Sequence, residues 1–167
     1  LSAIDSRHMI TDLLTEVRHV PFRLSDLVVY GAKGNPFYIE QMIYLLYDDE
    51  VIQPQESRKN VNLGKLEALT VPEDLPALFQ ARVAHLLFAE KQIIEAASVV
   101  GQVFWDDAVR AMIMPETKLS AEAFQNVLSA LEQKALIVRR RSSRLAGVSE
   151  FSFVHDMLQD EVYEQLA

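Results

Sequence analysis

Apolar residues recur at intervals of three and four along most of the chain, the spacing of helices with one buried face. The clearest stretch runs from residue 36 to about 47 and follows Asn35 and Pro36. Asparagine is a favoured N-cap, and proline is tolerated at the first helical position because its missing N–H needs no partner there. A shorter apolar helix is expected just before it, with Ser25 as its cap. The pattern therefore predicts two consecutive helices joined at a sharp turn.

The central region changes pattern. Residues 51–69 are polar and weakly patterned, so we expect a loop or short extended segments and a domain boundary there. The segment 70–73 has capping-box spacing with a proline, which predicts a helix opening at Thr70. A second helix is expected from about 89 to 100, ending at Gly101.

The last third combines helical and strand patterns. A short helix is expected from Asp106 to Met112, and Ser120 caps the next one. Residues 136–140 and 150–155 alternate as strands do, and Asp156 is expected to cap a final helix. Three helices followed by a hairpin are the winged-helix plan. The predicted fold is mainly α, a helical subdomain followed by a winged helix with one small β-hairpin.

Composition narrows the class of protein. Half of the 167 residues are apolar, 24% are charged and none is cysteine, which excludes disulfides and thiolate metal sites. No apolar run approaches the roughly 20 residues of a membrane span, and the first 20 residues carry too many charges for a signal peptide. We therefore expect a cytoplasmic protein with no membrane partner. The absence of an initial methionine suggests a piece of a longer chain.

The charge distribution bears on nucleic-acid binding. The formal net charge is −8, and neither half of the chain is basic. The basic cluster Arg139, Arg140, Arg141 and Arg144 lies on the predicted wing. It would contact DNA phosphates or an acidic neighbouring domain. The second reading is favoured because the preceding helix presents acidic and amide side chains, namely Glu122, Gln125, Asn126, Glu132 and Gln133.

Catalytic signatures do not appear in the sequence. The Gly31–Gly34 stretch lacks the spacing and hydroxyl of a phosphate loop. His155 has no other histidine at metal-ligand spacing, and residues 48–50 are read as a solvated acidic helix end. The chain is thus expected to hold no metal and to perform no catalysis.

Four segments, in this order, resemble signal-transduction ATPases with numerous domains, the STAND NTPases. They are residues 34–40 (GNPFYIE), 71–75 with 81–83 (VPEDL, ARV), 96–104 (AASVVGQVF), and 151–156 with 161–166 (FSFVHD, EVYEQL). The family includes ATPase modules of bacterial class III adenylate or guanylate cyclases and of LuxR-type and MalT-like regulators. Two departures are Ser152, where arginine is usual, and the lack of a tryptophan in 51–69.

The resemblance implies a role for each part. Residues 1–68 would be the remnant of the helical lid and 69–167 the winged-helix domain. Gly34, Asn35 and Pro36 would face the nucleotide in the full-length parent, whose missing core would bind ATP or ADP with magnesium. The segment would couple nucleotide state to a cyclase or transcriptional output domain, its partners being that core and output. The alternative is a DNA-binding winged-helix transcriptional regulator.

Overall fold

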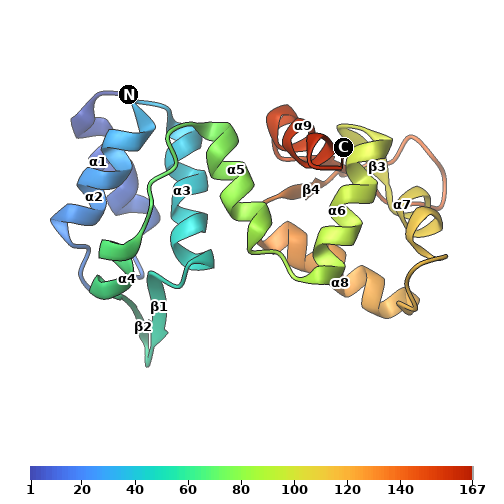
Figure 1. Ribbon diagram of the computed structural model, residues 1–167, viewed down its shortest axis with the longest axis horizontal. Coiled ribbons are helices and arrows are strands. Elements are labelled where there is room, and N and C mark those ends of the chain that lie inside the picture. The colour runs from blue at the N-terminus through green and yellow to red at the C-terminus, as the bar shows by residue number, and fades with distance from the viewer. Residues whose placement is uncertain (167) are drawn as a thin grey trace. The chain divides into compact units, whose positions relative to one another are not determined.

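The computed structural model describes residues 1–166 and is mainly helical, with two small antiparallel sheets (Figure 1). The chain divides into two compact units, Leu1–His85 and a second beginning at Leu86. The expected division after residue 68 lies earlier in the chain than this one. The difference is one helix, Leu75–Ala84, which packs on the helices before it.

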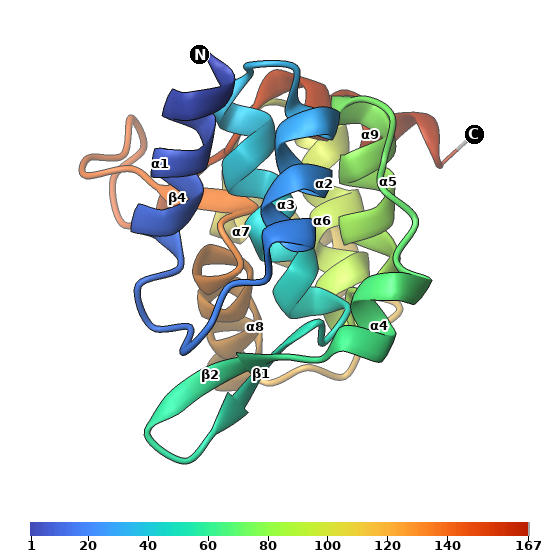
Figure 2. The same ribbon diagram turned by 90° about the vertical axis from the view of Figure 1, so that its left-hand side faces the viewer.

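The first unit is organised around helix α3 (Pro36–Asp48), which contacts α1 (Ala3–Leu13), α2 (Phe22–Ala32) and α5 (Leu75–Ala84). Figure 2 shows α1, α2 and α3 side by side. Their shared core includes Ile10, Leu24, Ile39, Met42, Leu46 and Leu78. Burial of this apolar area is what holds the four helices together.

A hairpin of β1 (Ile52–Gln55) and β2 (Arg58–Val61) follows α3 and projects beyond the helices (Figures 1 and 2). Its two-residue turn is Glu56–Ser57, and Glu56 has a positive φ of 47°. Ile52 is buried at its base, and the short helix α4 (Leu63–Ala68) comes next. The region expected to be a loop or extended segments is thus a hairpin followed by a helical turn.

The second unit runs α6 (Phe88–Val100), β3 (Val103–Trp105), α7 (Asp106–Ile113), α8 (Ala121–Gln133), β4 (Ile137–Arg139), β5 (Glu150–Phe153) and α9 (Asp156–Glu164). Strand β5 lies between β3 and β4 and is antiparallel to both. Phe104 of β3 stacks on Phe151 of β5, with ring centroids 5.6 Å apart. The expected hairpin therefore gains a third strand from residues 103–105.

Helix termini test the capping predictions directly. Asn35 caps α3 with Pro36 in its first turn, Ser120 caps α8, and α6 ends at Gly101, as predicted. The predicted caps Ser25, Thr70 and Asp156 are wrong.

Each of the three misplaced caps has a structural cause. Helix α2 begins four residues earlier than Asp26, after Pro21, whose fixed φ suits a helix entry. Asp74 caps α5, accepting from Ala77 N at 2.9 Å, because Pro72 is buried in a segment that is not helical. At α9 the cap is His155, whose Nδ1 accepts from Met157 N at 3.0 Å, so Asp156 is the first helical residue.

Candidate functional site

The predicted nucleotide-facing residues form the junction between α2 and α3. Lys33 and Gly34 both have positive φ, 50° and 83°, which turns the chain between the helices. A Cβ on Gly34 would lie 2.6 Å from the Leu1 carbonyl oxygen, and the Leu1 amino group donates to the Gly34 oxygen at 2.8 Å. Both the backbone conformation and the close approach require glycine.

Asn35 and Pro36 complete this junction and are exposed. The Asn35 Oδ1 accepts from Phe37 N at 3.0 Å and Tyr38 N at 3.4 Å. The cap occupies that oxygen, so the Nδ2 amide is the side-chain group left facing solvent. The structure brings Gly34, Asn35 and Pro36 together, and their contact with a nucleotide stays a prediction.

Tyr38 links the first turn of α3 to the segment that leads into α5. Its hydroxyl donates to the Pro72 carbonyl oxygen at 2.5 Å, in the interior. Burial, with the nearby charge of Asp74, raises the pKa of Tyr38 to about 12. A Cβ on Gly31 would lie 2.6 Å from the Tyr38 hydroxyl oxygen, so glycine leaves room for this bond.

A second link joins the other end of α3 to α5 through a buried arginine. The Arg82 side chain is fully buried, and its Nε donates to Asp48 at 3.2 Å. Its Nη1 donates to Gln41 Oε1 at 2.6 Å, and the guanidinium lies 4.9 Å from the centre of the Tyr44 ring. Burial lowers the pKa of Arg82, and Asp48 opposes that change. We call Gln41, Tyr44, Asp48 and Arg82 the arginine clamp.

A histidine–carboxylate contact lies next to the arginine clamp, also between the end of α3 and the end of α5. His85 Nε2 contacts Asp49 Oδ1 one residue after α5 ends. Asp48 and Asp49, expected to be a solvated acidic end, instead hold the two basic residues of α5's last turn and cap. The acids are recognisable in the sequence, but their partners are not, because these lie more than 30 residues away.

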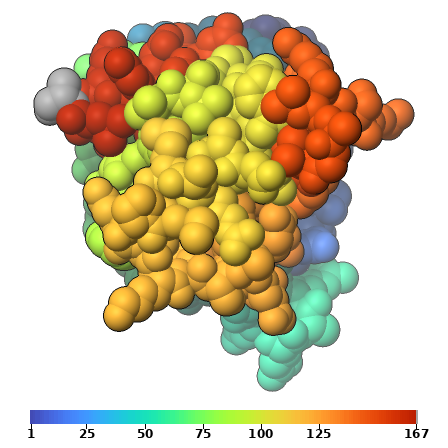
Figure 3. Space-filling model, turned by 90° about the vertical axis from the view of Figure 1, so that its right-hand side faces the viewer, coloured from blue at the N-terminus to red at the C-terminus, as the bar shows by residue number. Residues whose placement is uncertain are grey.

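The predicted arginine cluster lies on β4 and the β4–β5 loop (residues 140–149), which projects from the surface in Figure 3. Arg139 pairs with Glu132 at 3.2 Å, and its guanidinium carbon lies 4.7 Å from the centre of the Phe151 ring. Arg140 pairs with Glu150 at 2.6 Å. Arg144 donates its backbone N–H to the same carboxylate at 3.2 Å. Three of the four arginines thus hold the loop on its own unit.

Two buried carboxylates anchor the ends of that loop. Glu150 is 1% exposed and also accepts from Trp105 Nε1 at 3.1 Å. Asp106 accepts from Ser149 N at 3.0 Å and from Gln125 Nε2 at 3.2 Å. The anchoring role of both acids was not predicted. Glu150 is out of phase with the apolar Phe151 and Phe153 of its strand, so the alternation gives no sign that it is buried.

Chemistry beyond these contacts is sparse. In residues 1–166 no group of three histidine, aspartate or glutamate side chains is placed to hold a metal ion. No helix within that range is long and apolar enough to cross a bilayer. His155 serves as a helix cap.

Comparison of the chain with protein-family models, with curated proteins and with solved structures finds no match. The resemblance to signal-transduction ATPases therefore rests on the four sequence segments and stays a prediction.

Proposed function

We propose that this chain is the transmission segment of a nucleotide-controlled signalling ATPase and has no catalysis of its own. In this role it passes the state of a nucleotide site in the parent protein to an output domain. Such a device works through contacts that differ between two states.

The observation that carries the proposal is the pair of links from α3 to α5. The junction Gly34–Pro36 opens α3, and Tyr38 in its first turn bonds to the segment before α5. The arginine clamp holds the last turns of α3 to the last turn of α5. A displacement of the junction would thus be carried by both links to α5, which ends where the first unit ends.

The topology of the second unit supports the same proposal. The order helix, strand, helix, helix, strand, strand, with β5 between β3 and β4, fits the proposed winged helix, in which the β4–β5 loop would be the wing. In the proposal this unit relays the displacement through packing, since its loop arginines are mostly committed to internal carboxylates.

The test needs the complete gene product that contains this segment. Pro36→Ala should weaken binding of a fluorescent ADP analogue by about fivefold or more, within the usual range of coupling between sites. Pro115→Ala, at an exposed proline of the second unit, is the control and should bind as the unaltered protein does. A gene product without an upstream phosphate loop, or equal affinities for both variants, would reject the proposal.

DNA binding is the second candidate, favoured by one observation. The β4–β5 loop carries Arg140, Arg141 and Arg144, has no acidic residue, and leaves Arg141 exposed. Against it, α8 exposes Glu122 in its first turn, where a phosphate would otherwise be attracted. Fluorescence anisotropy with duplex DNA separates the candidates. Tight binding with a steep salt dependence, lost in Arg141→Ala, would establish the regulator instead.

A further inference from the structure

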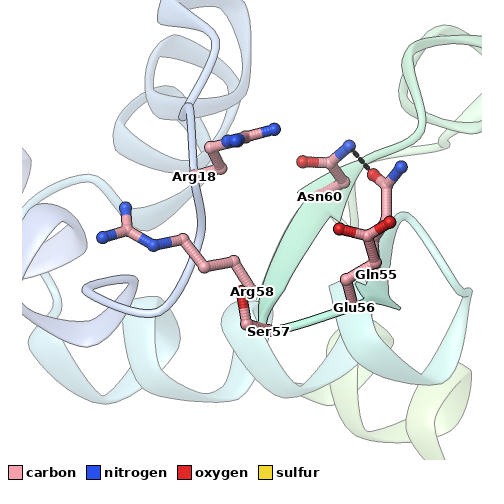
Figure 4. Close-up of a pocket in the computed structure, with 6 residues that line it drawn as sticks. All are labelled: Arg18, Gln55, Glu56, Ser57, Arg58 and Asn60. Carbon is pink, nitrogen blue, oxygen red and sulfur yellow. Dashed lines mark hydrogen bonds between the residues drawn. The ribbon is translucent and has the colours of Figure 1, made fainter.

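The outer face of the β1–β2 hairpin carries a polar cavity of about 220 Å³ (Figure 4). Its lining, the hairpin cavity, comprises Arg18, Gln55, Glu56, Ser57, Arg58 and Asn60. The volume is below the range typical of pockets for drug-sized ligands. A cavity of this size suits a small ion with several acceptor oxygens.

The strand pairing explains why these side chains gather. Arg58 and Asn60 are two residues apart on β2, so they point to the same side, and Gln55 faces Arg58 across the hairpin. Lys59, between them, points to the other side and pairs with Glu16. Lys59, which is neutralised by Glu16, thus lies on one face of the hairpin. The other face carries the side chains of Arg58 and Asn60.

Arg18 is fixed beside this face by the main chain. Val17 forms a parallel bridge with Lys59, and Arg18 N donates to the Lys59 oxygen at 2.9 Å. Lys59 N donates in turn to the Glu16 oxygen at 3.1 Å. The connection after α1 thus acts as a third strand, and Figure 4 shows the Arg18 side chain extending towards Asn60.

The charges in the cavity lack internal partners. No ion pair in residues 1–166 involves Arg18 or Arg58, although the chain carries more acids than bases. Asn60 Nδ2 donates to Gln55 Oε1, which leaves the Gln55 amide N–H groups available. Glu56 is the one carboxylate in the lining. Arg58 extends away from Gln55 in Figure 4, and as an exposed side chain it is free to turn inward.

We propose that the hairpin cavity binds a phosphate-class oxyanion between Arg18 and Arg58, with the Gln55 amide and the Ser57 hydroxyl as further donors. Guanidinium groups match such oxyanions because their paired N–H donors contact two oxygens at once. The site is distinct from the α2–α3 junction and does not depend on the transmission role.

The experiment is an NMR titration of the 167-residue chain, following the Gln55 and Asn60 side-chain amides and the Arg18 and Arg58 Nε–H signals. Sodium phosphate is added at constant ionic strength against sodium chloride. Saturable shifts with a millimolar midpoint are expected, and Arg18→Ala/Arg58→Ala should weaken binding by about tenfold or more, since both pairs of charge-assisted donors are lost. Glu56→Gln should tighten it severalfold by removing a like charge.

Arg23→Ala is the matched control, because Arg23 is also an exposed, unpaired arginine of the first unit but lies on α2. It should bind as the unaltered chain does. A parallel titration with glycerol 3-phosphate tells a free ion from the phosphate of a monoester, and binding of either one supports the site. Shifts that do not saturate, that chloride reproduces, or that persist in the double variant overturn it. If the double variant fails to fold, Arg18→Lys/Arg58→Lys, which keeps charge but loses the paired donors, takes its place.

Discussion

The two units bury charges of opposite sign. In the first unit the buried charged side chain is Arg82, which a carboxylate and an amide of α3 surround. In the second unit the buried charges are the carboxylates of Glu90, Asp106 and Glu150. Glu90 and Glu150 pair with side chains that reach solvent: Lys134 contacts Glu90 at 2.6 Å, and Arg140 contacts Glu150 at 2.6 Å. Asp106 instead accepts hydrogen bonds from Ser149 N and Gln125 Nε2.

The buried charges therefore hold different structures in the two units: a helix in the first and a surface loop in the second. Arg82 joins the last turn of α5 to α3, so its removal should loosen α5 from α3. Glu150 and Asp106 hold a surface loop by its two ends, so their removal should free the loop while the helical core remains. Trp105 is the sole tryptophan and lies in the second unit, so its fluorescence reports that unit. Far-UV circular dichroism reports both units.

The largest effect is expected from Arg82→Met. It leaves Asp48 and buried Gln41 without their partner, which should lower the free energy of unfolding of the first unit by about 3 kcal/mol. In urea denaturation the circular dichroism transition should move while the Trp105 transition stays in place. Arg23→Met, at an exposed site on α2, is the control and should cost less than about 0.5 kcal/mol. Equal shifts for the two variants would show that the arginine clamp does not stabilise the first unit.

Glu150→Gln is the corresponding test in the second unit. The amide keeps the shape but loses the charge that Arg140 and the Trp105 N–H contact, which should cost about 2 kcal/mol. Here the Trp105 transition should move and the remainder of the dichroism transition should not. Glu132→Gln, which breaks only the surface pair with Arg139, should cost less than about 0.5 kcal/mol. A Glu150 variant as mild as the Glu132 variant would show that the loop is not anchored by charge.

Helix caps offer a balanced comparison between the units. Asn35→Ala and Ser120→Ala each remove a side-chain acceptor from a helix start, and each should cost about 1 kcal/mol. The first should shift the dichroism transition and the second the Trp105 transition. If either variant shifted both transitions equally, the units would unfold as one cooperative body and the comparison would fail.

The smallest loss of stability at neutral pH is expected at Tyr38, whose contribution also depends on pH. Folding raises the pKa of Tyr38 from its ordinary value of 10 to about 12, so the folded state favours the neutral phenol. Its contribution is complete below pH 10 and is lost as the pH rises to 12. Tyr38→Phe should cost about 0.5 to 1 kcal/mol at neutral pH. It should also abolish the decline of the first unit between pH 10 and 12, followed by urea midpoints. Exposed Tyr30→Phe should leave the decline unchanged.

Features set by neighbours in sequence were predictable, and features set by distant contacts were not. The Asn35–Pro36 start of α3 and the Ser120 cap were found because each cap acts within three residues. Thr70 had equally good local spacing, yet the Pro72 oxygen bonds to Tyr38 instead of taking part in a helix, and the cap lies at Asp74. A local signal was overridden by a partner 34 residues away.

The pairing of β1 with β2 in the hairpin was not predicted, for a different reason. Its strands read IQPQ and RKNV, without alternating apolar residues, and its turn contains no glycine. What orders it is the buried Ile52 and the main-chain pairing of Lys59 with residues 16–18. In the candidate sites the arginines were visible as a cluster, whereas Glu150 and Asp106 were not, because their role depends on strand β3 lying against β5.

Helix α3 has a further consequence for experiment. Seven of its 13 residues are buried, and other helices of the first unit pack against it. Its central amides, at Met42 and Ile43, should therefore exchange with solvent deuterium only when the whole unit opens. Their exchange rate would measure the unfolding free energy of the first unit in the absence of denaturant. It would do so while the second unit remains folded.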